Sequence, residues 1–267
     1  MPSVTDPARE LADVFERLSP GAKGRGDDHL ASQFGVAAWS TNFYQIVFCI
    51  TERSDALMEI IAGLEMDDDL KNDARRHLKD IRQAFARDSL SKSWQDVGAK
   101  HLRRENVQPI KMLSPYVRQK IFYPKLDDEE VKELLELLAK LQDWLEKQQL
   151  AEQDFVRQAI LESIRNVRFR LERIGWLGWG YTVSSIREVI GAYLALESGL
   201  PDVAVAPDAE AVLKKVRAFL KTFYEKTGTM KDVVDTGDFL LKAYGAASLV
   251  YHGAGIAGLL TYAGISP

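Results

Sequence analysis

The chain has 267 residues, of which 46% are hydrophobic and 28% are charged, an ordinary composition for a globular protein with a buried core. Its 35 basic and 39 acidic residues give a net charge of −4, so nucleic acid is not the expected partner. The single cysteine, Cys49, lies in an apolar run, which favours a buried side chain in a reducing compartment. The N-terminal sequence lacks the basic and apolar regions of a signal peptide, so we expect a cytoplasmic protein.

Nearly every informative stretch has apolar residues at the 3.6-residue period of an α-helix, and the alternation of a β-strand is not sustained. Asp6 followed by Pro7 predicts the start of a short helix. Three apolar residues share one face of that helix: Leu11, Phe15 and Leu18. Residues 30–51 carry no formal charge but contain Ser, Thr, Asn and Gln. This pattern predicts a helix that is buried on most sides rather than a membrane span.

The acidic residues at 67–69 predict the capped start of the next helix, and the prolines within 94–124 predict short helical pieces. Residues 126–150 and 152–173 each carry an apolar stripe and are separated by a short polar turn. They predict an antiparallel helical hairpin. A glycine-rich break precedes a third predicted helix at 183–196.

Asp208 predicts the start of a further helix that ends near Gly228, and a final helix is predicted to run into a Gly/Ala-rich tail. The predicted fold is therefore all-α, a multi-helix bundle with a central antiparallel hairpin and a Gly/Ala-rich C-terminal helix. We predict an N-terminal helical region at 1–125, the hairpin with the third helix at 126–200, and a C-terminal helical pair at 208–267. The alternative is that all three form one domain.

Catalytic motifs are not apparent. The four histidines are isolated, and none belongs to a metal-binding or paired Glu-x-x-His pattern. Phosphate-binding loops and nucleophile motifs are also lacking. We therefore predict no catalytic residues, no cofactor and no metal, and we expect a non-enzymatic protein. An enzyme of unrecognised type remains a third reading, because a helical bundle can build a site from scattered residues.

Arginines recur at helical spacing in the second helix of the predicted hairpin, at Arg157, Arg165, Arg168 and Arg173. Arginine suits bidentate binding of a carboxylate or phosphate and stacking on aromatic rings, so these residues are a candidate interaction surface. The alternative is that they form ion pairs with the many acidic residues of the preceding helix, between 129 and 146.

The segment GWLGWGY, residues 175–181, interleaves three aromatic residues with three glycines. Trp176, Trp179 and Tyr181 are candidates for a rigid docking surface or for a belt at a membrane interface. The alternative is a corner between helices, in which the glycines permit the turn and the tryptophans fill the core.

Residues 243–265 carry no charged side chain and would span about 34 Å as a helix, just enough to cross a bilayer. Small residues lie four apart, which allows close helix packing. The candidate membrane or helix-packing face consists of Gly253, Ala254, Ala257 and Gly258. Because the run contains five glycines and few aliphatic residues, a buried soluble helix is the competing interpretation.

Two functional hypotheses follow. The first is a non-enzymatic helical protein that associates with copies of itself or with another protein through the arginine- and tryptophan-lined surface. The second is a membrane-acting or membrane-anchored effector, of the kind found in bacterial conflict and abortive infection, whose tail at 243–265 inserts in the bilayer. Under the second hypothesis the protein would be peripheral to the inner membrane or inserted in it through the tail.

Overall fold

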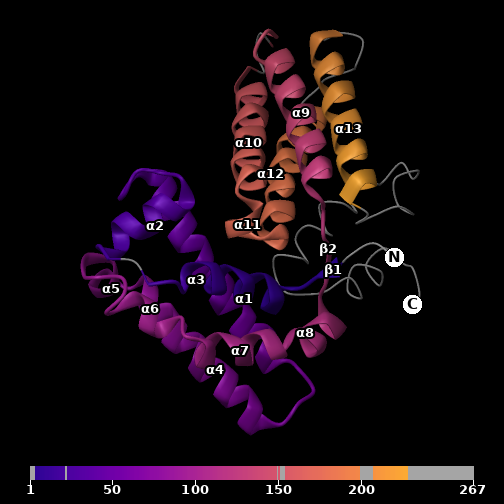
Figure 1. The fold of residues 1–267 in the computed structure, drawn as a ribbon. Helices are drawn as coiled ribbons and strands as arrows, with labels where there is room; N and C mark the ends of the chain where they lie inside the picture. The colour runs from indigo at the N-terminus through magenta and orange to yellow at the C-terminus, as the bar shows by residue number, and fades with distance from the viewer. Residues whose placement is uncertain (1–3, 22, 149, 151–153, 199–206, 228–267) are drawn as a thin grey trace. The chain divides into compact units, whose positions relative to one another are not determined.

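The computed structural model describes residues 4–21, 23–148, 150, 154–198 and 207–227. The described chain is almost entirely helical (Figure 1), which confirms the predicted all-α, multi-helix fold. The described ranges also contain two strands of two residues each, β1 (Val4–Thr5) and β2 (Tyr123–Pro124). The predicted final helix and its Gly/Ala-rich tail lie outside the described residues.

The chain divides into two compact units. The N-terminal unit comprises Thr5–Phe122 together with Gly175–Gly178. The C-terminal unit comprises Tyr123–Ile174 and the residues from Trp179 onward, with Val4. The assignment of domains to 1–125, 126–200 and 208–267 stays a prediction.

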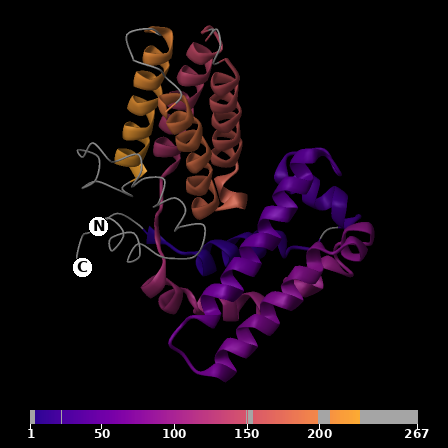
Figure 2. The ribbon, with the colours of Figure 1, turned by 180° about the vertical axis from the view of Figure 1, so that it is seen from behind.

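The helices of the N-terminal unit are short except for α3. They are α1 (Pro7–Leu18), α2 (Gly26–Phe34), α3 (Thr41–Ala62), α4 (Asp68–Arg82), the 3₁₀ turn η1 (Gln83–Phe85), α5 (Arg87–Ser91), α6 (Gly98–His101), α7 (Arg104–Met112) and α8 (Ser114–Lys120). Helix α1 packs against α3, α7 and α8, and α4 packs against both α3 and α7. Figure 2 shows these helices from the opposite side.

The C-terminal unit contains four long helices: α9 (Asp128–Leu145), α10 (Asp154–Glu172), α12 (Trp179–Ser198) and α13 (Pro207–Thr227). Helices α9 and α10, which lie where the two helices of the hairpin are predicted, pack against each other, and α12 packs against α10. Helix α13 lies against α9 and α12, so the four run side by side in both views (Figures 1 and 2). The one-turn helix α11 (Ile174–Leu177) lies in the glycine-rich break between α10 and α12.

Capping residues start several of these helices where the sequence predicts. Asp6 accepts a hydrogen bond from the backbone N–H of Arg9, at 3.0 Å, and Asp67 caps α4. Helix α9 begins with a capping box, in which Asp127 and Glu130 each accept a hydrogen bond from the other's backbone N–H. These caps satisfy N–H groups that lack a partner within the helix.

The core of the N-terminal unit forms around α1 and Trp94. The predicted face of α1, Leu11, Phe15 and Leu18, is fully buried. Trp94 is also fully buried, and its indole N–H donates to the carbonyl of Leu18 at 3.1 Å. A side-chain donor in the core is tolerated because it has this partner.

One sequence prediction is wrong. Residues 30–51 do not form a single helix, because α2 ends at Phe34 and α3 begins at Thr41. Gly35 ends α2 in the left-handed conformation, at φ 66°, which a glycine adopts without steric penalty. The segment is also not buried on most sides, since Tyr44 and Phe48 of α3 are more than half exposed.

Candidate functional site: an exposed aromatic surface on α3

The most buried of the predicted arginines, Arg157, belongs to the fold of the C-terminal unit. Its guanidinium binds the carboxylate of Asp154 through two hydrogen bonds, at 2.6 and 3.0 Å, and donates a third to the carbonyl of Leu145 at the end of α9. The hydrogen bonds from Arg157, followed by one from the backbone N–H of Leu150, lower the pKa of Asp154 from 3.8 to about 2. Arg157 therefore ties the start of α10 to the end of α9.

The other predicted arginines are also paired with carboxylates. Arg165 of α10 binds Glu146, just after α9, at 2.9 Å. Arg168 binds Glu172 at 2.9 Å and Arg173 binds the same residue at 3.3 Å. These exposed pairs contribute little to stability individually, but each sets a carboxylate beside the guanidinium group that a ligand would need. Of these three ion pairs, only that of Arg165 joins the arginine to an acid near the preceding helix. The sequence predicts, as the alternative to an interaction surface, that all of the arginines pair with acids of that helix.

Trp176 lies on the N-terminal unit, within the short Gly175–Gly178 segment. The guanidinium of Arg17 lies 4.1 Å from the centre of its ring, and the ring of Phe34 meets it edge-on at 5.1 Å. Arg53 donates a hydrogen bond to its carbonyl at 2.7 Å. Gly178 follows at φ 81°, and a Cβ there would overlap the guanidinium of Arg53. Trp176 thus covers other side chains of the unit.

Trp179 and Tyr181 belong to the C-terminal unit. The side chain of Trp179 is 2% exposed, and its ring stacks on that of Phe223 with centroids 6.4 Å apart. The ring of Tyr181 is half-buried and lies 4.6 Å below the guanidinium carbon of Arg170. The aromatic residues of GWLGWGY are therefore divided between the two units, and the structure does not gather them on one exposed face.

The predicted packing face, Gly253, Ala254, Ala257 and Gly258, lies outside the described residues. Within the described ranges, no helix is both long and apolar enough to span a membrane.

Two histidines of the N-terminal unit belong to one hydrogen-bonded cluster. The Nδ1 atom of His101 lies 3.1 Å from a carboxylate oxygen of Asp80. The Nδ1 atom of His77 lies 3.0 Å from the amide oxygen of Asn106, and the amide nitrogen of Asn106 donates to Asp80. No set of three or more His, Cys, Asp or Glu side chains among the described residues is placed to hold a metal ion.

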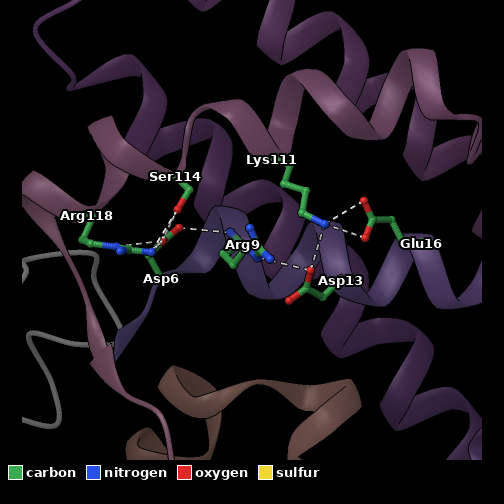
Figure 3. Close-up of polar contacts among 7 residues, drawn as sticks. All are labelled: Asp6, Arg9, Asp13, Glu16, Lys111, Ser114 and Arg118. Carbon is green, nitrogen blue, oxygen red and sulfur yellow. Dashed lines mark hydrogen bonds and ion pairs between the residues drawn. The ribbon is translucent and has the colours of Figure 1, made fainter. Parts of the chain in front are cut away.

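A second cluster, shown in Figure 3, surrounds the N-cap of α1. The carboxylate of Asp6 is fully buried and accepts hydrogen bonds from the hydroxyl of Ser114, at 2.5 Å, and from the guanidinium of Arg118, at 3.2 Å. A hollow of about 330 Å³ is lined by Ser114, Pro115, Arg118 and Gln119. The hydroxyl of Ser114 and the guanidinium of Arg118 in this cluster thus both bind the buried carboxylate. Its contacts hold α8 against the start of α1.

Three aromatic residues near the start of α3 are exposed and lie together. Tyr44 is 55% exposed and Phe48 is 62% exposed. The ring of Trp39, which is 39% exposed, lies 5.8 Å from that of Tyr44. We call Trp39, Tyr44 and Phe48 the α3 aromatic surface. Contiguous exposed aromatic side chains are typical of protein interaction sites, whereas single exposed apolar residues are normal.

The backbone of Trp39 is held in an unfavourable conformation. Its φ of 60° is in the left-handed region, and no other non-glycine residue in the described ranges has a positive φ. The indole N–H of Trp39 donates to the carboxylate of Asp27 at 2.7 Å, and Asp27 is itself buried. The hydrogen bond from Arg25, and then that from Trp39, keep the pKa of Asp27 below 3.8, although burial acts in the opposite direction. The indole is therefore held by an ionised carboxylate.

The exposed face of α3 around these residues is uncharged. Residues 40–51 contain no Asp, Glu, Lys or Arg. Thr41, Tyr44, Phe48 and Thr51 lie three and four residues apart and so share one face. The opposite face is buried in the unit through Phe43, Ile46, Ile50, Leu57 and Ile61.

Sequence reasoning missed the α3 aromatic surface. It interpreted the charge-free run as buried on most sides, whereas the helical period separates Tyr44 and Phe48 from the stripe of Phe43, Ile46 and Ile50. This separation around the helix is the sequence signal that could have identified Tyr44 and Phe48 as exposed. The strained backbone at Trp39 has no signal in the sequence. No protein-family model, curated protein or solved structure matches this chain.

Proposed function

We propose that this protein acts without catalysis, by associating with protein through the α3 aromatic surface. The observation that carries the proposal is Trp39. Its left-handed backbone is destabilising by about 1–2 kcal/mol for a residue with a side chain. A buried carboxylate nevertheless holds its indole at the surface beside Tyr44. Strain that is maintained in this way is characteristic of functional positions.

The size of the surface supports the same function. From their exposed fractions, Trp39, Tyr44 and Phe48 together leave roughly 300 Å² of side chain in water. This is the size of the largest apolar patches on typical monomers, which are often functional. Aromatic side chains are also the residues that contribute most to binding in protein interfaces.

The α3 aromatic surface is a better candidate than the residues around GWLGWGY. The guanidinium groups of Arg157, Arg165, Arg168 and Arg173 are paired with carboxylates, and Trp179 is buried. A partner that used them would have to replace existing interactions. The α3 residues require only the removal of water. The membrane hypothesis concerns residues 243–265 and remains a separate prediction.

The test is site-specific photocrosslinking in cells that express the full chain, with the photoreactive residue at Gln45, an exposed position between Tyr44 and Phe48. We expect covalent adducts with protein that are lost when Tyr44→Ser and Phe48→Ser are added. The matched control places the photoreactive residue at Asn72, an exposed position on α4 of the same unit, where we expect no such adducts.

Two results would contradict the proposal. One is the lack of protein adducts at position 45. The other is a set of adducts that persists unchanged in the Tyr44→Ser/Phe48→Ser variant. Flotation of the purified protein with lipid vesicles, if abolished by the same substitutions, would instead assign the surface to a membrane interface.

A further inference from the structure

We infer that the occupant of the α3 aromatic surface is a second copy of this chain, whose α3 lies antiparallel across a two-fold axis. In this arrangement Tyr44 of one copy packs on the partner's Phe48, and the reverse contact forms on the other side of the axis. The inference rests on the proposed function, since it names the partner for the same surface.

The first argument is the spacing of the exposed residues. Thr41, Tyr44, Phe48 and Thr51 are separated by three, four and three residues, so the order threonine, aromatic, aromatic, threonine is the same from either end. A two-fold axis that passes midway between Tyr44 and Phe48 therefore places each aromatic ring against an aromatic ring. The same axis places Thr41 against the partner's Thr51. An interface about a two-fold axis requires a surface that is complementary to itself, and this surface has that property.

The second argument is charge. Since residues 40–51 are uncharged, the antiparallel contact brings no like charges together. The first charged residue beyond Thr51 is Glu52, and one oxygen of its carboxylate is buried. Asp55, the next acid on this face, already binds Arg82. The acids next to the contact are thus buried or paired, and the contact itself stays uncharged.

The third argument concerns the strength of the contact. The three aromatic residues supply roughly 300 Å² on each copy, against about 800 Å² per partner in a stable interface. We therefore expect a reversible dimer whose population depends on concentration in the micromolar range or above. An obligate dimer would need a larger surface than this face of α3 provides.

Sedimentation velocity of the full-length protein over a wide concentration range is the first experiment. We expect the sedimentation coefficient to rise with concentration, and Tyr44→Ser/Phe48→Ser to weaken the association at least tenfold. Phe155→Ser is the matched control, because Phe155 is 73% exposed but lies on α10 of the other unit, and it should leave the association unchanged. Circular dichroism verifies that the variants are folded. If the double variant does not fold, Phe48→Glu replaces it, since it sets a carboxylate against the partner's aromatic ring.

The register is tested by thiol crosslinking. An equimolar mixture of Thr41→Cys and Thr51→Cys proteins should be joined by a short bismaleimide, whereas each variant alone should not. The native Cys49 is buried and so does not compete. Each protein in the mixture carries only one of the two introduced thiols, so a crosslink between positions 41 and 51 joins two chains.

Failure of this inference differs from failure of the proposed function. A full-length protein that stays monomeric at all concentrations, while Gln45 still forms adducts with other proteins, would overturn the second copy and retain the docking site. Self-association that is insensitive to Tyr44→Ser/Phe48→Ser would also overturn it. Crosslinking of Thr41→Cys alone would contradict the antiparallel register.

Discussion

Replacement of Asp6 by alanine tests whether one buried carboxylate holds α1 and α8 together. Loss of the N-cap hydrogen bond to Arg9 costs about 1 kcal/mol. The hydroxyl of Ser114, which is buried, loses its acceptor, at about 1–3 kcal/mol. The side chain of Arg118 is 43% exposed, so its ion pair adds less than about 1 kcal/mol. We therefore expect Asp6→Ala to lower the free energy of unfolding of the N-terminal unit by about 3 kcal/mol.

The assay is native-state hydrogen exchange of the full chain, read by mass spectrometry for peptides of α1 and α8, which reports on this unit alone. Asp6→Asn is the control, since its side-chain oxygen still accepts from a backbone N–H, and it should lose about 1 kcal/mol. In the Ser114→Ala background the effect of Asp6→Ala should shrink by about 1 kcal/mol. A loss below 1 kcal/mol for Asp6→Ala, or equal losses for the alanine and asparagine variants, would refute the reasoning.

Three further predictions concern both units. The carboxyl of Asp154 should titrate with a pKa of about 2. Its contribution to the stability of the fold is therefore complete above pH 3.8 and is lost as the pH falls toward 2. In the Arg157→Gln variant the pKa of this carboxyl, measured by NMR, should return toward 3.8. In urea unfolding, Gly178→Ala should lower the free energy of unfolding by about 2 kcal/mol and Gly35→Ala by about 1 kcal/mol. Both glycines have a positive φ, but only Gly35 has open space where the new methyl group would lie. Equal losses would contradict this prediction. The Trp39→Gly variant should have a free energy of unfolding about 1 kcal/mol higher than that of Trp39→Ala, because only glycine adopts the left-handed backbone of position 39 without strain. If the alanine variant is the more stable of the two, the backbone at Trp39 is not strained.

Much of the fold could be predicted from the sequence because local signals agree with tertiary packing. Asp6 with Pro7 marks the start of α1, and the acidic residues at 127–130 mark the start of α9. In each case the capping residue is followed by an apolar stripe that the structure buries. Agreement between local signals and the global fold is what makes such helices predictable.

The candidate site could not be predicted in the same way. Tyr44 and Phe48 are as apolar in the sequence as Phe43 and Ile46, and only the packing of α3 against α1, α2 and α4 decides which face is covered. The break at Gly35 is a local signal, but it is outweighed in the sequence by an uninterrupted charge-free run. The arginines of α10 allow two interpretations from the sequence, a surface that binds a partner or ion pairs with neighbouring acids. The two differ in which group each guanidinium binds, and that depends on distances that the sequence does not contain.

The connection between α2 and α3 gives the physical reason to place association on this face. Gly35 already turns the chain at the end of α2, and a glycine at position 39 would make the second left-handed bend without strain. The bend itself therefore does not require a tryptophan. The hydrogen bond between Trp39 and Asp27 fixes an indole ring beside Tyr44, on the rim of an uncharged aromatic face. Fixing a side chain before binding reduces the entropy that association must overcome.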